Sequence, residues 1–305
     1  MKIRSKLVLT FAPLALLTLV LLGSLAYFSA RDALTEQVLH NLTSVAAIQD
    51  RQISSIVDQN LERLALVASR TQLRLSLDKY IAGDEIQVHQ NKMNRILTDA
   101  VNTVPAFHKL FVQTMDGRIV ASSDPGQIGN SQADAEFFLA GQLGNRVDLF
   151  YRDAGGQLGV FFAGPLFLGE ILLGVLVIES DVSNMIASTT DYHGLGSTGE
   201  TILVRRTAKG DAMFINPARF AAGAALELVV PKQDQDAPYT QSLMKRQKLS
   251  EDAVDYTGHK VIAVTRYLEE VDWGLVVQMR RAEAFAPIDR LRGVLLILIS
   301  LFWHW

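Results

Sequence analysis

Five side chains of this sequence are of the types and spacing that could bind a small organic cation. Tyr151 and Asp153 stand two residues apart in the run 147–153, so they share one face if this run is a strand. Glu179 lies near the end of a later apolar run, and Phe137-Phe138 offers apolar walls. A tyrosine and two carboxylates beside aromatic rings suit a protonated amine, through charge-assisted hydrogen bonds and cation–π contact.

A purely structural interpretation of the same residues is also open. Tyr151 would pack in the core, Asp153 would belong to the turn Asp153-Ala154-Gly155-Gly156, and Glu179 would be solvated. The binding interpretation requires the strands at 147–153 and 171–180 to lie in one sheet, with the three polar side chains on one face.

Other site chemistry finds no support in the sequence. None of the six histidines forms an H-x-x-H or HExxH pattern, and the absence of cysteine removes thiol nucleophiles and cysteine zinc sites. Gly194-x-Gly196-x-x-Gly199 has dinucleotide-loop spacing, but a helix is expected before it and a strand after it, the reverse of that motif. The glycines are better explained by a tight entry into a second sheet domain. We therefore expect no enzymatic activity, no cofactor and no metal site in this chain.

The composition is that of a folded protein with about two domains. The 305 residues are 49% apolar and 20% charged, which excludes a disordered or collagen-like chain. Lys and Arg number 29 against 32 Asp and Glu, so the chain lacks the basic excess of a nucleic-acid-binding protein.

The N-terminal end is predicted to be a membrane anchor. Leu7 to Ala30 is 24 residues without a charge, a length that spans about 36 Å as a helix and can cross a hydrocarbon core of about 30 Å. Lys2, Arg4 and Lys6 place the N-terminus in the cytoplasm. A cleaved signal peptide would have a shorter apolar core and a better cleavage site than Phe28-Ser29-Ala30.

A second apolar run, Gly293 to Trp305, has 13 residues and is too short to span. It is either a membrane-dipping tail or, as we predict, the start of a second membrane helix cut off by truncation. Residues 31–292 would then lie outside the inner membrane, in the bacterial periplasm.

Helical periodicity dominates the first part of the segment between these runs. Residues 31 to about 70 predict one long helix, which could act as a stalk, pack against the domains, or do both. The stretch at about 72–102 predicts further helix with a break at Gly83.

Strand-like runs follow from residue 109, with Asp116-Gly117 as a hairpin signal. Val160–Ala163 aligns with Lys260–Ala263, and Gly174–Val177 with Gly274–Val277, at one shared offset. This repeat predicts two similar sheet domains in series. Residues 220–250 are polar and irregular and predict an insertion, and the second domain shows fewer paired polar groups, so we expect it to be structural.

The predicted fold is therefore α+β, with an N-terminal membrane helix, a long stalk helix, two tandem PAS-like antiparallel-sheet subdomains and the start of a second membrane helix. The boundaries are 1–30 for the cytoplasmic tip and first membrane helix, 31–108 for the stalk and second helix, 109–190 for the membrane-distal subdomain, 191–284 for the membrane-proximal subdomain, and 285–305 for the helix entering the second membrane segment.

This arrangement resembles the double Cache (dCache) family of extracytoplasmic sensor domains over about residues 31–285. The local signatures are Ser69-Arg70-Thr71-Gln72-Leu73-Arg74, the segment Gly194–Thr201, and Asp272-Trp273-Gly274-Leu275-Val276-Val277. The family occurs in bacterial histidine kinases, diguanylate cyclases and chemoreceptors. The resemblance implies a ligand-sensing input module, most of all of a histidine kinase, that signals by small helix shifts across the membrane. We also expect a homodimer in the lipid bilayer, because two stalk helices can bury their apolar stripes on each other. A membrane-anchored scaffold without ligand is the alternative.

In amino-acid-binding members of this family, a Tyr and an Asp two residues apart hold the ligand's amine, together with a later Asp. Tyr151 and Asp153 match that pair, Glu179 stands in place of the later Asp, and Phe137-Phe138 replaces a Trp-Tyr pair. The Arg expected to grip the ligand carboxylate is replaced by Ala135. The resemblance therefore implies a small-molecule ligand with an amine and puts simple amino acids in doubt.

Overall fold

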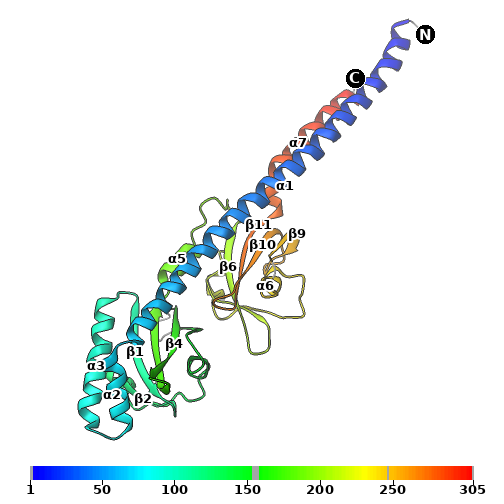
Figure 1. Cartoon of the computed structure of the whole chain (residues 1–305). Coiled ribbons are helices and arrows are strands. Elements are labelled where there is room, and N and C mark those ends of the chain that lie inside the picture. Colours follow the sequence, from blue (N-terminus) through cyan, green and yellow to red (C-terminus); the bar gives the residue numbers. More distant parts are fainter. Residues whose placement is uncertain (1–2, 153–157, 246, 304–305) are drawn as a thin grey trace.

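The computed structural model describes residues 3–152, 158–245 and 247–303 (Figure 1). One helix, α1 (Ile3–Ala68), runs along the whole molecule, and its 66 residues correspond to roughly 100 Å of helix. The C-terminal helix α7 (Arg281–Trp303) returns beside the first part of α1, so both chain ends lie at the same end of the molecule (Figure 1).

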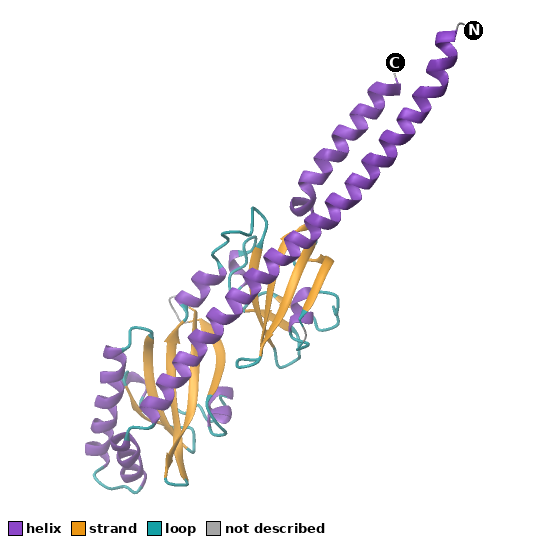
Figure 2. Ribbon diagram, turned by 45° about the horizontal axis from the view of Figure 1, so that its top comes forward, coloured by secondary structure: helices purple, strands orange, loops and turns teal. Residues whose placement is uncertain are grey.

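Helix α1 carries both sheet domains on its flank (Figure 2). Its apolar stripe is covered by the chain itself: Leu42, Ile53 and Leu64 are fully buried. The expectation that this helix packs against the domains is confirmed. The stripe is consequently not free to pair with a second stalk, because the two sheets already cover it.

The second helical stretch consists of two helices, α2 (Thr71–Ile81) and α3 (Ile86–Thr103). The predicted break is confirmed at Gly83, whose φ of +80° places it in the left-handed region that glycine tolerates best. The two helices pack on each other, and α3 packs on β1 and β2 at the end of the molecule opposite the termini (Figure 1).

The first sheet has five antiparallel strands in the order β2-β1-β5-β4-β3. Their bounds are β1 Phe107–Thr114, β2 Ile119–Ser122, β3 Arg146–Arg152, β4 Leu158–Leu168 and β5 Ile171–Asp181. A 3-10 turn, η1 (Pro125–Gln127), and helix α4 (Glu136–Gly141) lie between β2 and β3, and α5 (Ser183–Thr189) leads out of the domain.

The second sheet has six antiparallel strands in the order β8-β7-β6-β11-β10-β9. Their bounds are β6 Glu200–Arg206, β7 Ala212–Phe214, β8 Val229–Val230, β9 Lys248–Val254, β10 Lys260–Leu268 and β11 Trp273–Arg280. A 3-10 turn, η2 (Ala222–Ala224), and helix α6 (Pro238–Ser242) complete it. The prediction of an insertion over 220–250 is wrong in part, because Pro238 to Ser242 are all buried against this sheet.

The predicted repeat is confirmed as two tandem sheets: the order β2-β1-β5-β4-β3 of the first corresponds to β7-β6-β11-β10-β9 of the second, and β8 is an additional strand. The hairpins after β1 and β6 even share one turn: Gly117 N–H bonds to Thr114 C=O and Gly210 N–H to Thr207 C=O, both at 2.8 Å.

The gapless alignment of the repeat is wrong in its second strand. Val175 and Val177 of β5 face helix α4, whereas Val276 and Gln278 of β11 face α6. Since side chains alternate along a strand, the equivalent pairs differ by 101 positions rather than 100. In this corrected register Glu179 corresponds to Arg280.

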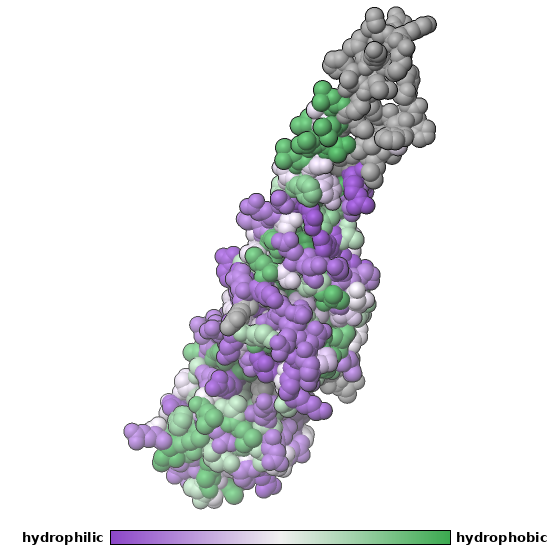
Figure 3. Space-filling view, turned by 90° about the vertical axis from the view of Figure 1, so that its right-hand side faces the viewer, coloured by the Kyte–Doolittle hydropathy of each residue, from purple (hydrophilic) through white to green (hydrophobic). Residues whose placement is uncertain are grey.

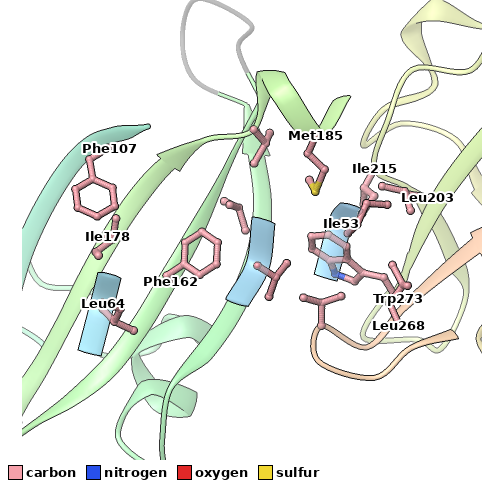
Figure 4. Close-up of a cluster of buried hydrophobic side chains, with 14 of the residues drawn as sticks. Ile53, Leu64, Phe107, Phe162, Ile178, Met185, Leu203, Ile215, Leu268 and Trp273 are labelled. Atoms are coloured by element: carbon pink, nitrogen blue, oxygen red, sulfur yellow. The ribbon is translucent and has the colours of Figure 1, made fainter. Parts of the chain in front are cut away.

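One continuous core joins the two sheets through α1 (Figure 4). Leu64 of α1 lies toward Phe162 and Ile178 of the first sheet, and Ile53 lies toward Trp273 of the second (Figure 4). Both sheets therefore contact α1, and a change in how one sheet packs on this helix also affects the contact with the other sheet.

Within the residues described here, no helix combines the length and the apolar character needed to cross a membrane.

Candidate ligand-binding site

Helix α4 covers the face of the first sheet that points away from α1. Phe137 and Phe138 are its buried side chains, and they pack among Phe111, Ala163, Val175 and Val177. The helix sits close to the sheet because Gly141 has no side chain: a Cβ there would lie 2.8 Å from Val175 Cγ1. The prediction that Phe137-Phe138 forms apolar walls agrees with this burial.

Two aromatic residues that the sequence analysis did not single out extend these walls. The Phe161 ring is tilted against that of Phe137 at 4.7 Å between centroids, and Phe111 meets Phe137 edge-on at 6.3 Å. Both follow from strand alternation, since Phe161 and Ala163 share one face of β4 and Phe111 faces the same side from β1. The sheet face under α4 is thus an aromatic surface.

Glu179 lies on this same face, two residues beyond Val177, and is only 5% exposed. The strand register places it directly opposite Phe161 on β4 and Lys109 on β1. His108 Nε2 lies 3.9 Å from Glu179 Oε1. The solvated alternative for Glu179 is therefore wrong, because the carboxylate is buried among aromatic and basic neighbours.

Tyr151 and Asp153 are only partly placed by the structure. Tyr151 belongs to β3 and pairs with Gly159 of β4, while Asp153 lies outside the described residues. Strands β3 and β5 are in one sheet with β4 between them, which puts the two strands about 10 Å apart. The shared sheet that the pocket requires is present, and the convergence of the three polar side chains stays a prediction.

The second sheet fills the corresponding space with its own side chains. Helix α6 packs there as α4 does on the first sheet, and it buries Tyr239 beside Phe214 and Tyr256, with ring centroids 4.7 Å and 6.2 Å from that of Tyr239. Gly274 makes room for it, since a Cβ would lie 2.0 Å from Ser242 Oγ.

A buried carboxylate stands at the centre of this second space. Glu200 Oε1 accepts a hydrogen bond from Gln278 Nε2 at 2.9 Å. Its Oε2 accepts from the Arg219 backbone N–H at 2.9 Å and from the Tyr256 hydroxyl at 3.0 Å. Tyr239 donates to Gln278 Oε1 at 3.1 Å and completes the network. Burial raises the pKa of Glu200, and these hydrogen bonds partly oppose the shift.

This network was not predicted from the sequence. Few paired polar groups were expected in the second domain, yet four polar residues from β6, α6, β11 and the turn before β10 meet in the core. The pairing of Glu200 with Gln278 on neighbouring strands could have indicated the network, but this pairing can be recognised only once the strand register is known.

The glycine-rich loop Gly194–Gly199 binds a carboxylate of the chain itself. Glu283, in the first turn of α7, accepts hydrogen bonds from the Ser197 and Thr198 backbone N–H groups, both at 2.7 Å, and from both hydroxyls. Gly196 has a φ of +66°, and a Cβ there would lie 2.4 Å from Glu283 Oε1. The dinucleotide-like spacing therefore serves to fasten α7 to the second domain.

The charge of Glu283 is stabilised at this position. Burial alone would raise the pKa of its carboxyl, but the hydrogen bonds from Thr198 and Ser197 outweigh burial and leave the pKa below the ordinary value. The contact holds the first turn of α7 in a fixed position on the second domain.

A family model described as a Cache domain matches residues 29–288. The chain belongs to the double Cache family. The predicted resemblance and the two-sheet architecture are thereby confirmed. Domains of this family are extracytoplasmic ligand-binding sensor domains of bacterial receptors.

Solved structures of sensor domains share the fold at low identity. The histidine kinase DctB sensor domain of V. cholerae superposes with a TM-score of 0.58 at 16% identity, covering 80% of this chain and 98% of that chain. The chemoreceptor CtaA domain of Pseudomonas fluorescens, in complex with L-isoleucine, gives 0.60 at 15% identity, covering 85% and 99%.

The amino-acid chemoreceptor PctC domain of Pseudomonas aeruginosa, in complex with GABA, gives 0.57 at 15% identity, covering 79% and 99%. No curated protein matches the sequence. At these identities the structural likeness is one of fold alone.

Proposed function

We propose that this double Cache chain is the ligand-sensing input module of a membrane-bound bacterial receptor, with its ligand under helix α4 of the first sheet domain. The observation that carries the proposal is Glu179, a buried carboxylate on the aromatic sheet face that α4 covers. The second domain closes the equivalent space with Tyr239 and Tyr256. We assign sensing to the first domain and transmission to the second.

We propose that Leu7–Ala30 anchors the receptor and that Gly293–Trp305 begins a second membrane segment. The sequence supports this through the uncharged 24-residue run and the three basic residues before it. The two segments belong to helices that lie side by side (Figure 1). A reporter that is active only in the cytoplasm should be silent when fused near residue 240. Activity of that reporter would place the sheet domains inside the cell.

We propose that the signal leaves through α7. Ligand binding would favour one packing of the first sheet on α1, and Glu283 would carry a shift of about 1–2 Å to α7 through the second domain. The output we place first is a histidine kinase, then a diguanylate cyclase, then a chemoreceptor. No catalytic step is assigned to this chain, and a tethered enzyme would need a constellation that the sequence does not contain.

We also propose a homodimer within the lipid bilayer. Its contact surface is not the stripe of Leu42, Ile53 and Leu64, which the sheets cover. The exposed apolar side chains of α1 nearer the N-terminus, among them Leu21, Leu22 and Leu25, are the surface that supports this pairing.

A thermal-shift screen of the full chain in neutral detergent tests the sensing function. A ligand that binds only the folded state raises the melting temperature in proportion to the logarithm of its concentration. We expect a saturable rise with an amine-bearing small molecule from a panel of amines, amino acids and carboxylates. If no panel member gives a saturable rise, the membrane-anchored scaffold without ligand becomes the better account of the chain.

A further inference from the structure

A cavity of about 420 Å³ lies where the two long helices leave the second sheet domain. It is distinct from the space under α4 and lies in the other domain. Three elements meet around it: α1, the first turns of α7, and the end of the sheet where β10 begins and β11 ends. The residues of its lining that bear charge or an aromatic ring include Arg31, Lys260, Arg280, Arg281, Phe285 and Asp289.

Cations dominate the lining of this cavity. Four residues carry a permanent positive charge, against one carboxylate, Asp289, and one histidine, His259. Two further carboxylates stand beside it: Asp252 pairs with Lys260 at 3.1 Å and with Arg281 at 2.6 Å, and Asp255 lies 3.8 Å from Arg280 Nε.

Aromatic rings hold three of the arginines in place. The guanidinium groups of Arg31 and Arg281 lie 5.7 Å and 5.4 Å from the ring centroid of Phe285, so both flank one aromatic ring. The guanidinium of Arg280 lies 4.1 Å from the ring centroid of Phe220 and donates to the Thr257 hydroxyl. Planar guanidinium groups bind phosphate oxygens in a bidentate manner, which makes them the preferred side chains for that anion.

We infer that this cavity binds a phosphate-bearing anion, held by Arg31 from α1 and by Lys260 and the two arginines at the junction of β11 and α7. The anion would join the helix that enters the sensor to the helix that leaves it. The inference does not depend on which ligand occupies the first domain.

Two sources could supply this anion: free phosphate or the headgroup of an anionic lipid. The neighbouring surface favours the lipid, because α1 exposes Leu21, Leu22, Leu25 and Phe28 just before Arg31. Figure 3 shows apolar side chains gathered toward this end of the molecule. A bound lipid would place its acyl chains on the apolar surface and its charged headgroup in the basic cavity.

The test uses the full chain, delipidated in neutral detergent, with melting temperature as the readout. Short-chain phosphatidylglycerol, short-chain phosphatidylcholine and inorganic phosphate are titrated separately at constant ionic strength. The variants are Arg31→Gln and Lys260→Gln, with Arg63→Gln as the matched control. Arg63 lies on the same helix and changes the net charge equally, but it is about 48 Å from Arg31 along the axis.

We expect phosphatidylglycerol to bind more tightly than phosphatidylcholine. Arg31→Gln and Lys260→Gln should each weaken phosphatidylglycerol binding about 5-fold, while Arg63→Gln leaves it unchanged. Saturable binding of inorganic phosphate with the same variant pattern would support the site and identify free phosphate as its occupant. Because Lys260 is mostly exposed, Lys260→Gln remains informative if Arg31→Gln fails to fold.

Three results would overturn the inference. One is that neither phosphatidylglycerol nor phosphate shifts melting beyond an equal concentration of chloride. Another is that phosphatidylcholine binds as tightly as phosphatidylglycerol. The third is that Arg31→Gln and Lys260→Gln bind the anion as tightly as Arg63→Gln.

Discussion

Replacing Glu200 by alanine should lower the free energy of unfolding by roughly 3–5 kcal/mol. The substitution leaves the Tyr256 hydroxyl, Gln278 Nε2 and the Arg219 N–H without their acceptor in the core of the second domain. Buried donors that lose a partner cost more than the net value of the hydrogen bond, because their desolvation is no longer offset. For a folded unit of about 250 residues, which α1 and the two sheet domains form around one core, the loss corresponds to a fall in melting temperature of about 6–20 °C.

Glu227→Ala is the matched control, because Glu227 is an exposed glutamate of the same domain. It should melt within about 1–2 °C of the parent. If Glu200→Ala also melts within that margin, water replaces the carboxylate freely, and the second domain does not depend on this network.

The pH dependence of the Glu200 effect has a defined sign. Burial raises the pKa of Glu200 in the folded state, so the folded chain binds this proton more tightly than the unfolded chain. The contribution of Glu200 to stability is then most favourable below the unfolded pKa, and it declines as pH rises through the folded pKa. The free energies of unfolding of the parent and of Glu200→Ala should therefore differ more near pH 5 than near pH 8.

Local sequence signals were sufficient for the long helices and for the first hairpin. The apolar spacing of 31–70, the break at Gly83 and the Asp116-Gly117 turn each depend on residues within about one turn of each other. The offset of the repeat was not determined by such signals. The apolar strands β5 and β11 align equally well at an offset of 100 or 101 positions. The two offsets can be distinguished only from the sheet face on which α4 and α6 pack.

The candidate site shows the same division between local and long-range information. Phe137-Phe138 could be recognised as a pair, and Glu179 as a polar residue at the end of an apolar strand. Lys109, His108 and Phe161 could not be found, because they approach Glu179 through the pairing of three strands. Helix α6 was missed because its polar residues form no apolar pattern, although Tyr239 is buried.

Asp153→Ala and Glu179→Gln should each weaken the binding of an amine-bearing ligand by about 10- to 150-fold. The estimate is the usual 1.5–3 kcal/mol for a charge-assisted hydrogen bond lost from a buried site. Calorimetry on the best ligand from the thermal-shift screen measures it. Glu170→Ala is the matched control, since Glu170 is an exposed carboxylate at the turn between β4 and β5.

The chemistry around Glu179 also predicts which amines bind. With Ala135 in place of a carboxylate-binding arginine, amines that lack a carboxylate should bind better than simple α-amino acids. If the best ligand is an anion, or if Asp153→Ala and Glu179→Gln bind as tightly as Glu170→Ala, the amine pocket is wrong and these residues serve packing alone.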